Sequence, residues 1–431
     1  MQRHAESNPR SIPIANVFRQ HFWWGAALLL LVLFPAALRA GTPHPSKASA
    51  DANQPHPEVT IPVTPLGYLP PGELPAFYNY ALVNLRFLDA NHLVFVFNIP
   101  GLLDRDNSCS VSDNERMVRA VVLELPSGRT LNRAEWKLYD FGDFLWSLGN
   151  GQLLLRRCTQ LDLLGADLRP RPWIKVAGEI QDLNFSPDRS IAVVEEKTEP
   201  SSGAKDSGTV PAITEQATSA ARTLVTFVQI HPLRGIARAE IPLPAAVPVT
   251  DQGILETLTA PKNQWVVNLQ PFHGPQRPIG SIHSLCSPAI RPITNDLFVA
   301  TVCAKRDENV FQGYDRKGLL LWQIPFPSDH LSPTLILVPN GGHFAIESLH
   351  LKHPHAPLDP VSKEDVEGQD IDIYDTLTGV RVATFQTTPV YTGGRNVDFS
   401  PDGSRMAVLH NGVIEIYALS ELEKAYRNPS R

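Results

Sequence analysis

A turn that occurs twice between apolar runs is the feature that most constrains the fold of this chain. Residues 183–194 read LNFSPDRSIAVV and residues 397–408 read VDFSPDGSRMAV. In such a turn Pro pre-sets φ at the first central position, Asp suits the next, and Gly accepts a positive φ. Arg189 stands where the second copy has Gly403, which predicts a strained turn or a turn of another type. Both segments are predicted β-hairpins.

Five weaker copies of this hairpin occur elsewhere. Each places a short turn rich in Asn, Gly, Asp or Pro before an apolar run. Together with the first two they give seven hairpins, and such internal repetition indicates a repeat architecture. The five turns lie at 87–92, 146–151, 259–264, 291–296 and 338–343.

A second hairpin, whose turn ends in glycine, follows most of the first kind. Residues 371–379 read IDIYDTLTG and residues 311–318 read FQGYDRKG, with similar segments at 121–128 and 227–235. Two hairpins in succession make a four-stranded antiparallel blade, and blades around a channel leave few exposed edges. The chain is therefore predicted to be an all-β, seven-bladed β-propeller. The blade near 250–282 has little room for an outer strand, so six or eight blades remain as alternatives.

The FSPDG turn at 399–403 and the YDxxxG turn at 374–379 resemble the inner and outer hairpins of WD-repeat-like (WD40-type) β-propellers. The resemblance covers about residues 58–419. No blade has a Trp-Asp ending, so the Asp–His relay of true WD repeats is not expected. The resemblance implies a WD-like propeller of the exported, bacterial type. It also implies that the loop between the second and third strands of each blade opens on the face of the inter-blade loops.

The ring is predicted to close through its N-terminal strand. The last blade has only three strands before the chain ends, and residues 59–63 have no blade of their own. If 59–63 supply the missing outer strand, an open sheet edge disappears. Pro62 is compatible with this place, because an outer edge strand tolerates proline.

The N-terminus predicts export. Arg3, Arg10 and Arg19 precede an apolar run, 22–38, and small residues follow it, as in a secretory signal peptide. We expect cleavage after Ala40 or after Ala50, with an uncleaved membrane anchor as the alternative. The predicted domains are a signal peptide or anchor (1–40), a flexible linker (41–57), the propeller (58–420) and a C-terminal tail (421–431). The predicted location is extracytoplasmic, periplasmic or secreted.

Three long interruptions fall between the second and third strands of their blades, at 100–115, 195–222 and 350–369. Long connections without structure of their own are usually functional or disordered. The Ser/Thr/Ala/Gly-rich composition of 195–222 favours a mobile loop. The other two are equally compatible with binding, so the face that carries all three is the predicted binding face.

The four cysteines suit disulfides in an exported chain. Cys286 and Cys303 are equidistant from the turn at 294–295, which places them opposite each other across a hairpin, within reach of a disulfide. Cys109 and Cys158 follow the second strands of adjacent blades, and a bridge between them would tether the first loop. Four free buried thiols are the alternative, and no catalytic role is expected.

The sequence contains one histidine cluster but no standard catalytic or metal-binding motif. His343, His350, His353 and His355 form the only histidine cluster, but their spacing matches no metal signature, and solvated loop histidines are the favoured interpretation. We therefore predict no metal and no cofactor, and retain His350, His353 and His355 only as candidate ligands. No G-x-S-x-G or H-E-x-x-H motif occurs.

Other polar and aromatic residues are interpreted as structural. The carboxylates Glu195, Glu196, Asp370 and Asp372 are predicted to be solvated. The strand tryptophans are predicted to pack between blades, with a sugar-stacking platform as the alternative; they are Trp136, Trp146, Trp173, Trp265 and Trp322.

Composition and fold together favour a binding module. The net charge of −6 is spread over the chain, without the clustered basic face that nucleic-acid binding needs. We predict a monomer that presents its loop-rich face to a protein or another envelope ligand, and that meets a membrane only through an uncleaved N-terminal segment. The alternative is a propeller hydrolase or lyase with its site at the central channel, because fold alone does not determine function.

Overall fold

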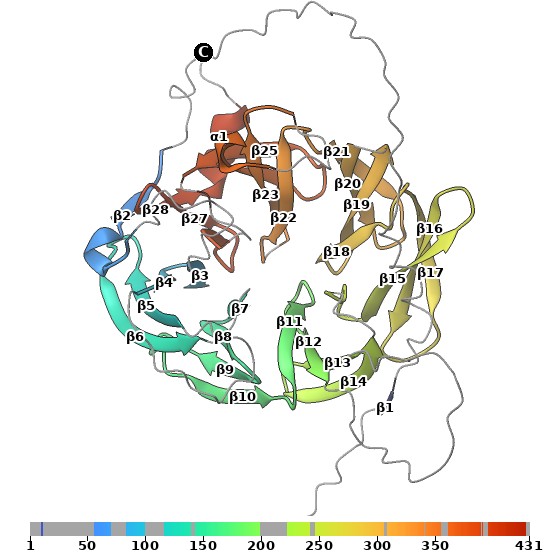
Figure 1. Cartoon of the computed structure of the whole chain (residues 1–431), viewed down its shortest axis with the longest axis horizontal. Helices are drawn as coiled ribbons and strands as arrows, with labels where there is room; N and C mark the ends of the chain where they lie inside the picture. The colour runs from blue at the N-terminus through green and yellow to red at the C-terminus, as the bar shows by residue number, and fades with distance from the viewer. Residues whose placement is uncertain are drawn as a thin grey trace, which may run out of the picture.

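Seven antiparallel sheets surround a central axis in the computed structural model (Figure 1). The structure describes residues 10–11, 56–69, 83–99, 116–138, 143–198, 222–241, 246–305, 308–339, 341–354, 361–388, 390 and 395–427. The predicted seven-bladed propeller is confirmed. Each of the seven predicted turns joins the two innermost strands of one blade.

The first three blades each hold four strands that run outward from the axis in sequence order. A two-residue strand, β1 (Arg10–Ser11), lies parallel to the outer strand of blade 3. The strands are β3 (Asn84–Asp89), β4 (His92–Asn98), β5 (Arg116–Glu124) and β6 (Thr130–Leu138) in blade 1; β7 (Leu145–Gly149), β8 (Gln152–Arg157), β9 (Gln160–Leu164) and β10 (Arg171–Lys175) in blade 2; and β11 (Glu179–Phe185), β12 (Ile191–Thr198), β13 (Arg222–Gln229) and β14 (Arg234–Ile241) in blade 3.

Blades 5 and 6 also have four strands, and blade 7 completes its sheet with the N-terminal strand β2. Blade 4 has three. The strands are β15 (Gly253–Ala260), β16 (Gln264–Pro271) and β17 (Arg277–His283) in blade 4; β18 (Ala289–Thr294), β19 (Leu297–Lys305), β20 (Glu308–Asp315) and β21 (Leu320–Pro325) in blade 5; β22 (His330–Leu337), β23 (His343–Leu351), β24 (Val366–Asp375) and β25 (Arg381–Thr387) in blade 6; and β26 (Val397–Phe399), β27 (Arg405–His410), β28 (Val413–Ala418) and β2 (Val59–Pro62) in blade 7.

The two FSPD turns share one hydrogen-bonding pattern. The Ser400 hydroxyl donates to Asp402, which accepts the Ser404 amide, and Ser186, Asp188 and Ser190 repeat this arrangement. Arg189 has φ of 58° where Gly403 has 67°. The first copy therefore keeps the turn and holds a non-glycine residue in the left-handed region, which is the strained alternative of the two predicted.

The core is divided among the blade interfaces. Seven clusters of buried apolar residues each join neighbouring blades; one example is Phe227 of β13 with Ile254 of β15, which lie in the cluster between blades 3 and 4. The five strand tryptophans belong to or pack against such clusters, which supports their structural interpretation. Because every blade packs mainly on its neighbours, one ring can exceed the usual size of a single-core domain.

The N-terminal strand closes the ring as predicted. Strand β2 pairs antiparallel with β28, and Ile61 lies opposite Ile414 in this ladder. The Ile61 side chain is 5% exposed and packs in the cluster between blades 7 and 1. Pro62 occupies the outer edge, where its missing N–H costs no ladder bond.

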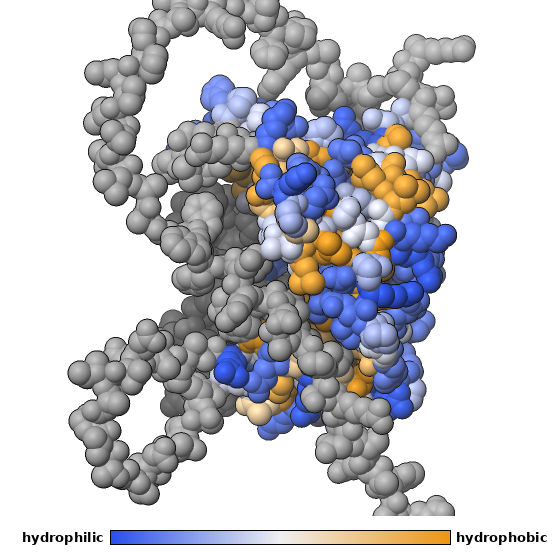
Figure 2. Space-filling view, turned by 90° about the vertical axis from the view of Figure 1, so that its right-hand side faces the viewer, coloured by the Kyte–Doolittle hydropathy of each residue, from blue (hydrophilic) through white to orange (hydrophobic). Residues whose placement is uncertain are grey.

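Blade 4 ends at its third strand, as its short sequence predicts, so β17 is the outer edge of this sheet. The strand carries Arg277 and Pro278 at its start, and charge and proline both discourage pairing with another chain. This part of the rim faces the viewer in Figure 2, where apolar areas are separated by polar ones.

Residues 421–427 of the predicted C-terminal tail (421–431) are part of a helix. Helix α1 (Leu419–Arg427) follows β28 directly, and Leu419 and Leu422 are buried in the cluster between blades 6 and 7. Glu423 of this helix pairs with His343 at 3.0 Å. Within the described ranges, no helix has both the length and the apolar character needed to cross a membrane. The predicted signal peptide and linker lie outside the described residues, apart from β1 and residues 56–57.

The structure joins Cys286 and Cys303 by a disulfide, with an S–S distance of 2.07 Å and Cα atoms 5.6 Å apart. The partners are as predicted, but a register shift between Pro292 and Thr294 leaves Cys286 just before β18 rather than within it. Among the described cysteines none is free, and Cys158 is also disulfide-bonded. Cys109 lies outside the described residues, so the bridge between Cys109 and Cys158 stays a prediction.

Glu195 and Glu196 correct the prediction that both are solvated. Strand β12 continues through Thr198, and the two side chains are 1% and 6% exposed. Glu195 accepts the amide of Val247, and Glu196 accepts the amides of Ala177 and Gly178, each at 3.0 Å. Buried carboxylates of this kind need such partners, and here they fix the connections that enter and leave blade 3.

Candidate functional site

The two faces of the disc differ in the length of their connections. Strand direction places the links between second and third strands on the same face as the links between blades, as the resemblance implies. This loop face carries the long connections 99–115, 199–221 and 352–365, together with 63–83 and 242–252. On the opposite face no turn is longer than 165–170. The predicted loops are shorter than expected, because β12 and β23 extend into them and β24 begins at Val366. Residues 100–115, 199–221 and 355–360 lie outside the described part.

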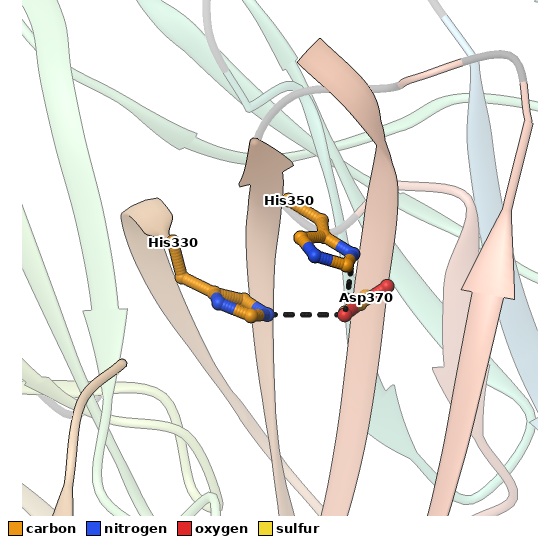
Figure 3. A group of neighbouring side chains, drawn as sticks. All are labelled: His330, His350 and Asp370. Atoms are coloured by element: carbon orange, nitrogen blue, oxygen red, sulfur yellow. Dashed lines mark hydrogen bonds and ion pairs between the residues drawn. The ribbon is translucent and has the colours of Figure 1, made fainter. Parts of the chain in front are cut away.

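Three polar side chains converge where blade 6 reaches the loop face (Figure 3). His330 begins β22, His350 lies near the end of β23, and Asp370 lies in the middle of β24. His330 and His350 are direct partners in the β-ladder, so their rings stack with centroids 4.8 Å apart and planes 9° from parallel. Both rings point a nitrogen at Asp370 Oδ2: His330 Nε2 at 3.0 Å and His350 Nδ1 at 3.3 Å.

Further polar groups surround this blade 6 cluster, defined as His330, His350 and Asp370. Asp329 Oδ1 lies 2.8 Å from His330 Nδ1, and Glu367 Oε2 lies 4.0 Å from His350 Nε2. The Gln386 amide lies 3.2 Å from His350 Nδ1. The side chains of the cluster are 11%, 26% and 17% exposed, in the order His330, His350 and Asp370, so they are accessible from one side.

Opposing effects set the protonation of His330. Burial by itself would lower its pKa, but the hydrogen bonds to Asp370 and Asp329, together with their negative charges, outweigh burial and raise the pKa above the usual value. In the absence of other ligands, His330 therefore favours the charged imidazolium form more than a free histidine does.

The four histidines that the sequence analysis grouped together lie in different parts of the structure. His350 joins the cluster, whereas His353 is exposed and takes no part in any group of candidate metal ligands among the described residues. His355 lies outside the described part. His343 begins β23 on the opposite face and pairs with Glu423. His330 was not among the residues predicted from the sequence, and Asp370 was predicted to be solvated. The signal that could have found them is the pairing of β23 with both β22 and β24.

A second polar group lies on the innermost strands of blades 7 and 1. Asp398 of β26 accepts the backbone amide of Phe87 in β3 at 2.7 Å, and its other oxygen lies 3.6 Å from Arg86. The Arg86 guanidinium also donates to the carbonyl of Leu145 in blade 2 at 3.1 Å. These contacts link the last blade to the first two, which supports a structural role at the point of closure.

Asp398 should make stability depend on pH. Burial raises the pKa of its carboxyl, and the charge of Arg86 only partly offsets this. The folded protein then keeps a proton that the unfolded chain has lost, so the free energy of unfolding should fall as pH rises from about 4 through the folded pKa. Asp398→Asn, which is neutral at every pH, should flatten this part of the curve in urea unfolding between pH 3 and 7. Parallel curves for the two proteins would contradict the expectation, and Asp296→Asn, at an exposed turn of blade 5, serves as the control.

The comparisons with known proteins bear on the fold only. No family model and no curated protein matches the sequence. Among solved structures, the WD40 domain of Toxoplasma gondii coronin is 11% identical, with 78% of this chain and 83% of that chain covered and a TM-score of 0.42. The Cps50 (Swd1) β-propeller domain of Myceliophteria thermophila is also 11% identical, with 79% and 96% covered and a TM-score of 0.41.

An enzyme also appears among the similar structures. The acylaminoacyl peptidase of Pyrococcus horikoshii is 11% identical, with a TM-score of 0.47 over 76% of this chain and 49% of that chain. The present chain thus spans about half the length of that peptidase. The chain is a seven-bladed β-propeller, a fold that hosts many functions.

Proposed function

We propose that this propeller is a binding module that engages a protein partner through its loop face. The observation that carries the proposal is the one-sided placement of the long connections. Binding residues are found disproportionately on loops that a rigid scaffold positions, and a closed ring of seven blades is such a scaffold. Because its own N-terminal strand closes the ring, the protein needs no second copy to complete the fold, and we propose that it acts as a monomer.

The proposed location is the cell envelope, outside the cytoplasm. Two features support it. Disulfides persist in oxidising compartments, and Cys286 and Cys303 are bonded. The apolar run 22–38 follows a basic stretch, as in a secretory signal peptide. In this proposal the membrane is contacted only through the N-terminal segment, and only if it is not cleaved.

The alternative, a hydrolase or lyase with its site at the channel, has weaker support. Two of its candidate groups on the innermost strands, Arg86 and Asp398, are engaged with backbone groups of neighbouring blades. Side chains bound to the backbone of a neighbouring blade stabilise the closed ring. The loop face therefore remains the better candidate for contact with other molecules.

Affinity capture from envelope fractions tests the binding function. In separate variants, residues 100–115 and 353–362 are replaced by short Gly-Ser linkers, which leave the strands intact. Each variant should lose the same partner, with affinity reduced at least about tenfold, or about 1.4 kcal/mol of binding free energy. The control shortens the opposite-face turn 165–170 and should keep the partner. An unchanged set of captured proteins in both loop variants would refute the assignment of the loop face.

A further inference from the structure

We propose that His330, His350 and Asp370 bind a divalent transition-metal ion, with zinc the best match, on the loop face of blade 6. Imidazole nitrogen and carboxylate oxygen are zinc ligands in proteins, and two histidines with one carboxylate form a known type of three-ligand zinc site. The proposal does not depend on the partner-binding function, because it concerns only the chemistry of these three side chains.

The β-ladder itself brings the ligands together. His330 on β22 is the direct ladder partner of His350 on β23, and Asp370 on β24 pairs with Ser348, two residues before His350. Alternate residues of a strand share one face of the sheet, so all three side chains emerge on the same side of blade 6 (Figure 3). Positions held by regular strands are more precise than positions on loops, which favours a defined coordination geometry.

The distances fit a small metal ion. The candidate ligand atoms, one from each residue, all lie within 4.8 Å of one another. Ligands placed about 2.0–2.1 Å from a tetrahedral zinc ion lie roughly 3.3 Å apart. The two histidine nitrogens are 3.0 and 3.3 Å from Asp370 Oδ2. Rotation of the two imidazole rings out of their stacked arrangement would direct both nitrogens at an ion between them.

The outer nitrogens of both histidines also face carboxylates. His330 Nδ1 lies 2.8 Å from Asp329, and His350 Nε2 lies 4.0 Å from Glu367. Metal-binding histidines usually donate their second N–H to a carboxylate or carbonyl, which fixes the tautomer and ring orientation and raises the basicity of the ligand. Asp329 is placed to orient His330 in this way, so that Nε2 is left to the metal.

Three protein ligands leave one position of a tetrahedral ion open, and that position would take water or a group of a bound molecule. The exposure of the cluster on the loop face permits this. The competing explanation is a charged His330 held between Asp329 and Asp370 as an ion pair. That arrangement would bind a proton and no metal, so the two explanations predict different outcomes in a metal titration.

The test is a titration of tag-free, chelator-stripped full chain with Zn²⁺ in competition with a chromophoric chelator. The wild type should bind one equivalent, and His330→Ala, His350→Ala and Asp370→Asn should each weaken binding at least about a hundredfold. Asp329→Asn, which removes only the orienting carboxylate, should weaken it about tenfold to a hundredfold. His343→Ala, on the same strand at the opposite face, and His353→Ala should bind as the wild type does.

Two further measurements keep the test independent of folding. Circular dichroism establishes that each variant is folded, and Asp370→Asn, which preserves the shape of the side chain, replaces any histidine variant that is not. Zinc should also raise the Tm of the wild type but not of Asp370→Asn, because a ligand that binds only the folded state stabilises it. Absence of saturable zinc binding by the wild type, or equal binding by Asp370→Asn, would overturn the proposal.

Discussion

Ile61→Asp should lower the free energy of unfolding by about 3–5 kcal/mol, because it places an unpaired carboxylate in a buried interface. Ile61 is 5% exposed, and its side chain packs between blades 7 and 1, where a Cβ atom on Gly128 would lie 3.2 Å from it. The substitution also weakens the pairing of β2 with β28, and so exposes an edge of the last blade. Urea unfolding followed by circular dichroism measures the loss.

The neighbouring Thr60→Asp is the matched control. Thr60 lies in the same short strand but is exposed, so this charge should change the free energy of unfolding by no more than about 0.5 kcal/mol. An open edge invites pairing with other chains, so light scattering should show association of the Ile61→Asp protein and none of Thr60→Asp. Equal stability of the two variants would mean that β2 does not close the ring in solution.

Trp322→Ala should destabilise the protein by about 3–5 kcal/mol, the range for removing a large aromatic side chain from a core. Trp322 is 7% exposed and stacks on Phe344 of blade 6 with ring centroids 5.3 Å apart. Its indole N–H donates to the carbonyl of Thr376 at 2.9 Å, again across the blade interface. A Cβ atom on Gly379 would lie 2.7 Å from the indole, which shows how closely blade 6 packs on it.

Two variants separate packing from hydrogen bonding at this interface. Trp322→Phe keeps most of the apolar contact and loses the N–H donor, so it should cost less than the alanine variant, about 1–3 kcal/mol. Leu321→Ala, at the adjacent exposed position of β21, should have little effect. Thermal unfolding of the three proteins orders them, and a Leu321→Ala loss as large as that of Trp322→Ala would contradict the assigned role.

The blades could be predicted from sequence because their signals are local. The turn at 400–404 needs only a serine, an aspartate and a residue that tolerates positive φ, all within a few positions. Ring closure was predicted by counting strands in the last blade. The end of β12 was not predicted, because charged and polar residues begin at Glu195 although the strand continues to Thr198. Their burial depends on amides from distant connections.

The blade 6 cluster could not be predicted from the sequence either, because it also depends on contacts between distant segments. His343 and His350 are close in sequence, but they lie at opposite ends of β23, about 23 Å apart at the usual rise of a strand. His330 and Asp370 are 40 residues apart, yet the register of three strands brings them within hydrogen-bond distance. Grouping by sequence distance therefore placed His343 with His350, whereas the ladder brings His350 to His330.

Strand β2 also has a consequence for the order in which the protein forms. Ile61 precedes its ladder partner Ile414 by 353 residues, so it is synthesised long before the strand with which it pairs. Domains generally fold as units while the chain emerges N-terminus first, but this ring cannot close before β28 has been made. Until then β2 has no ladder partner. Ribosome-bound chains truncated before residue 413 should accordingly be digested readily by protease, whatever the number of blades already made.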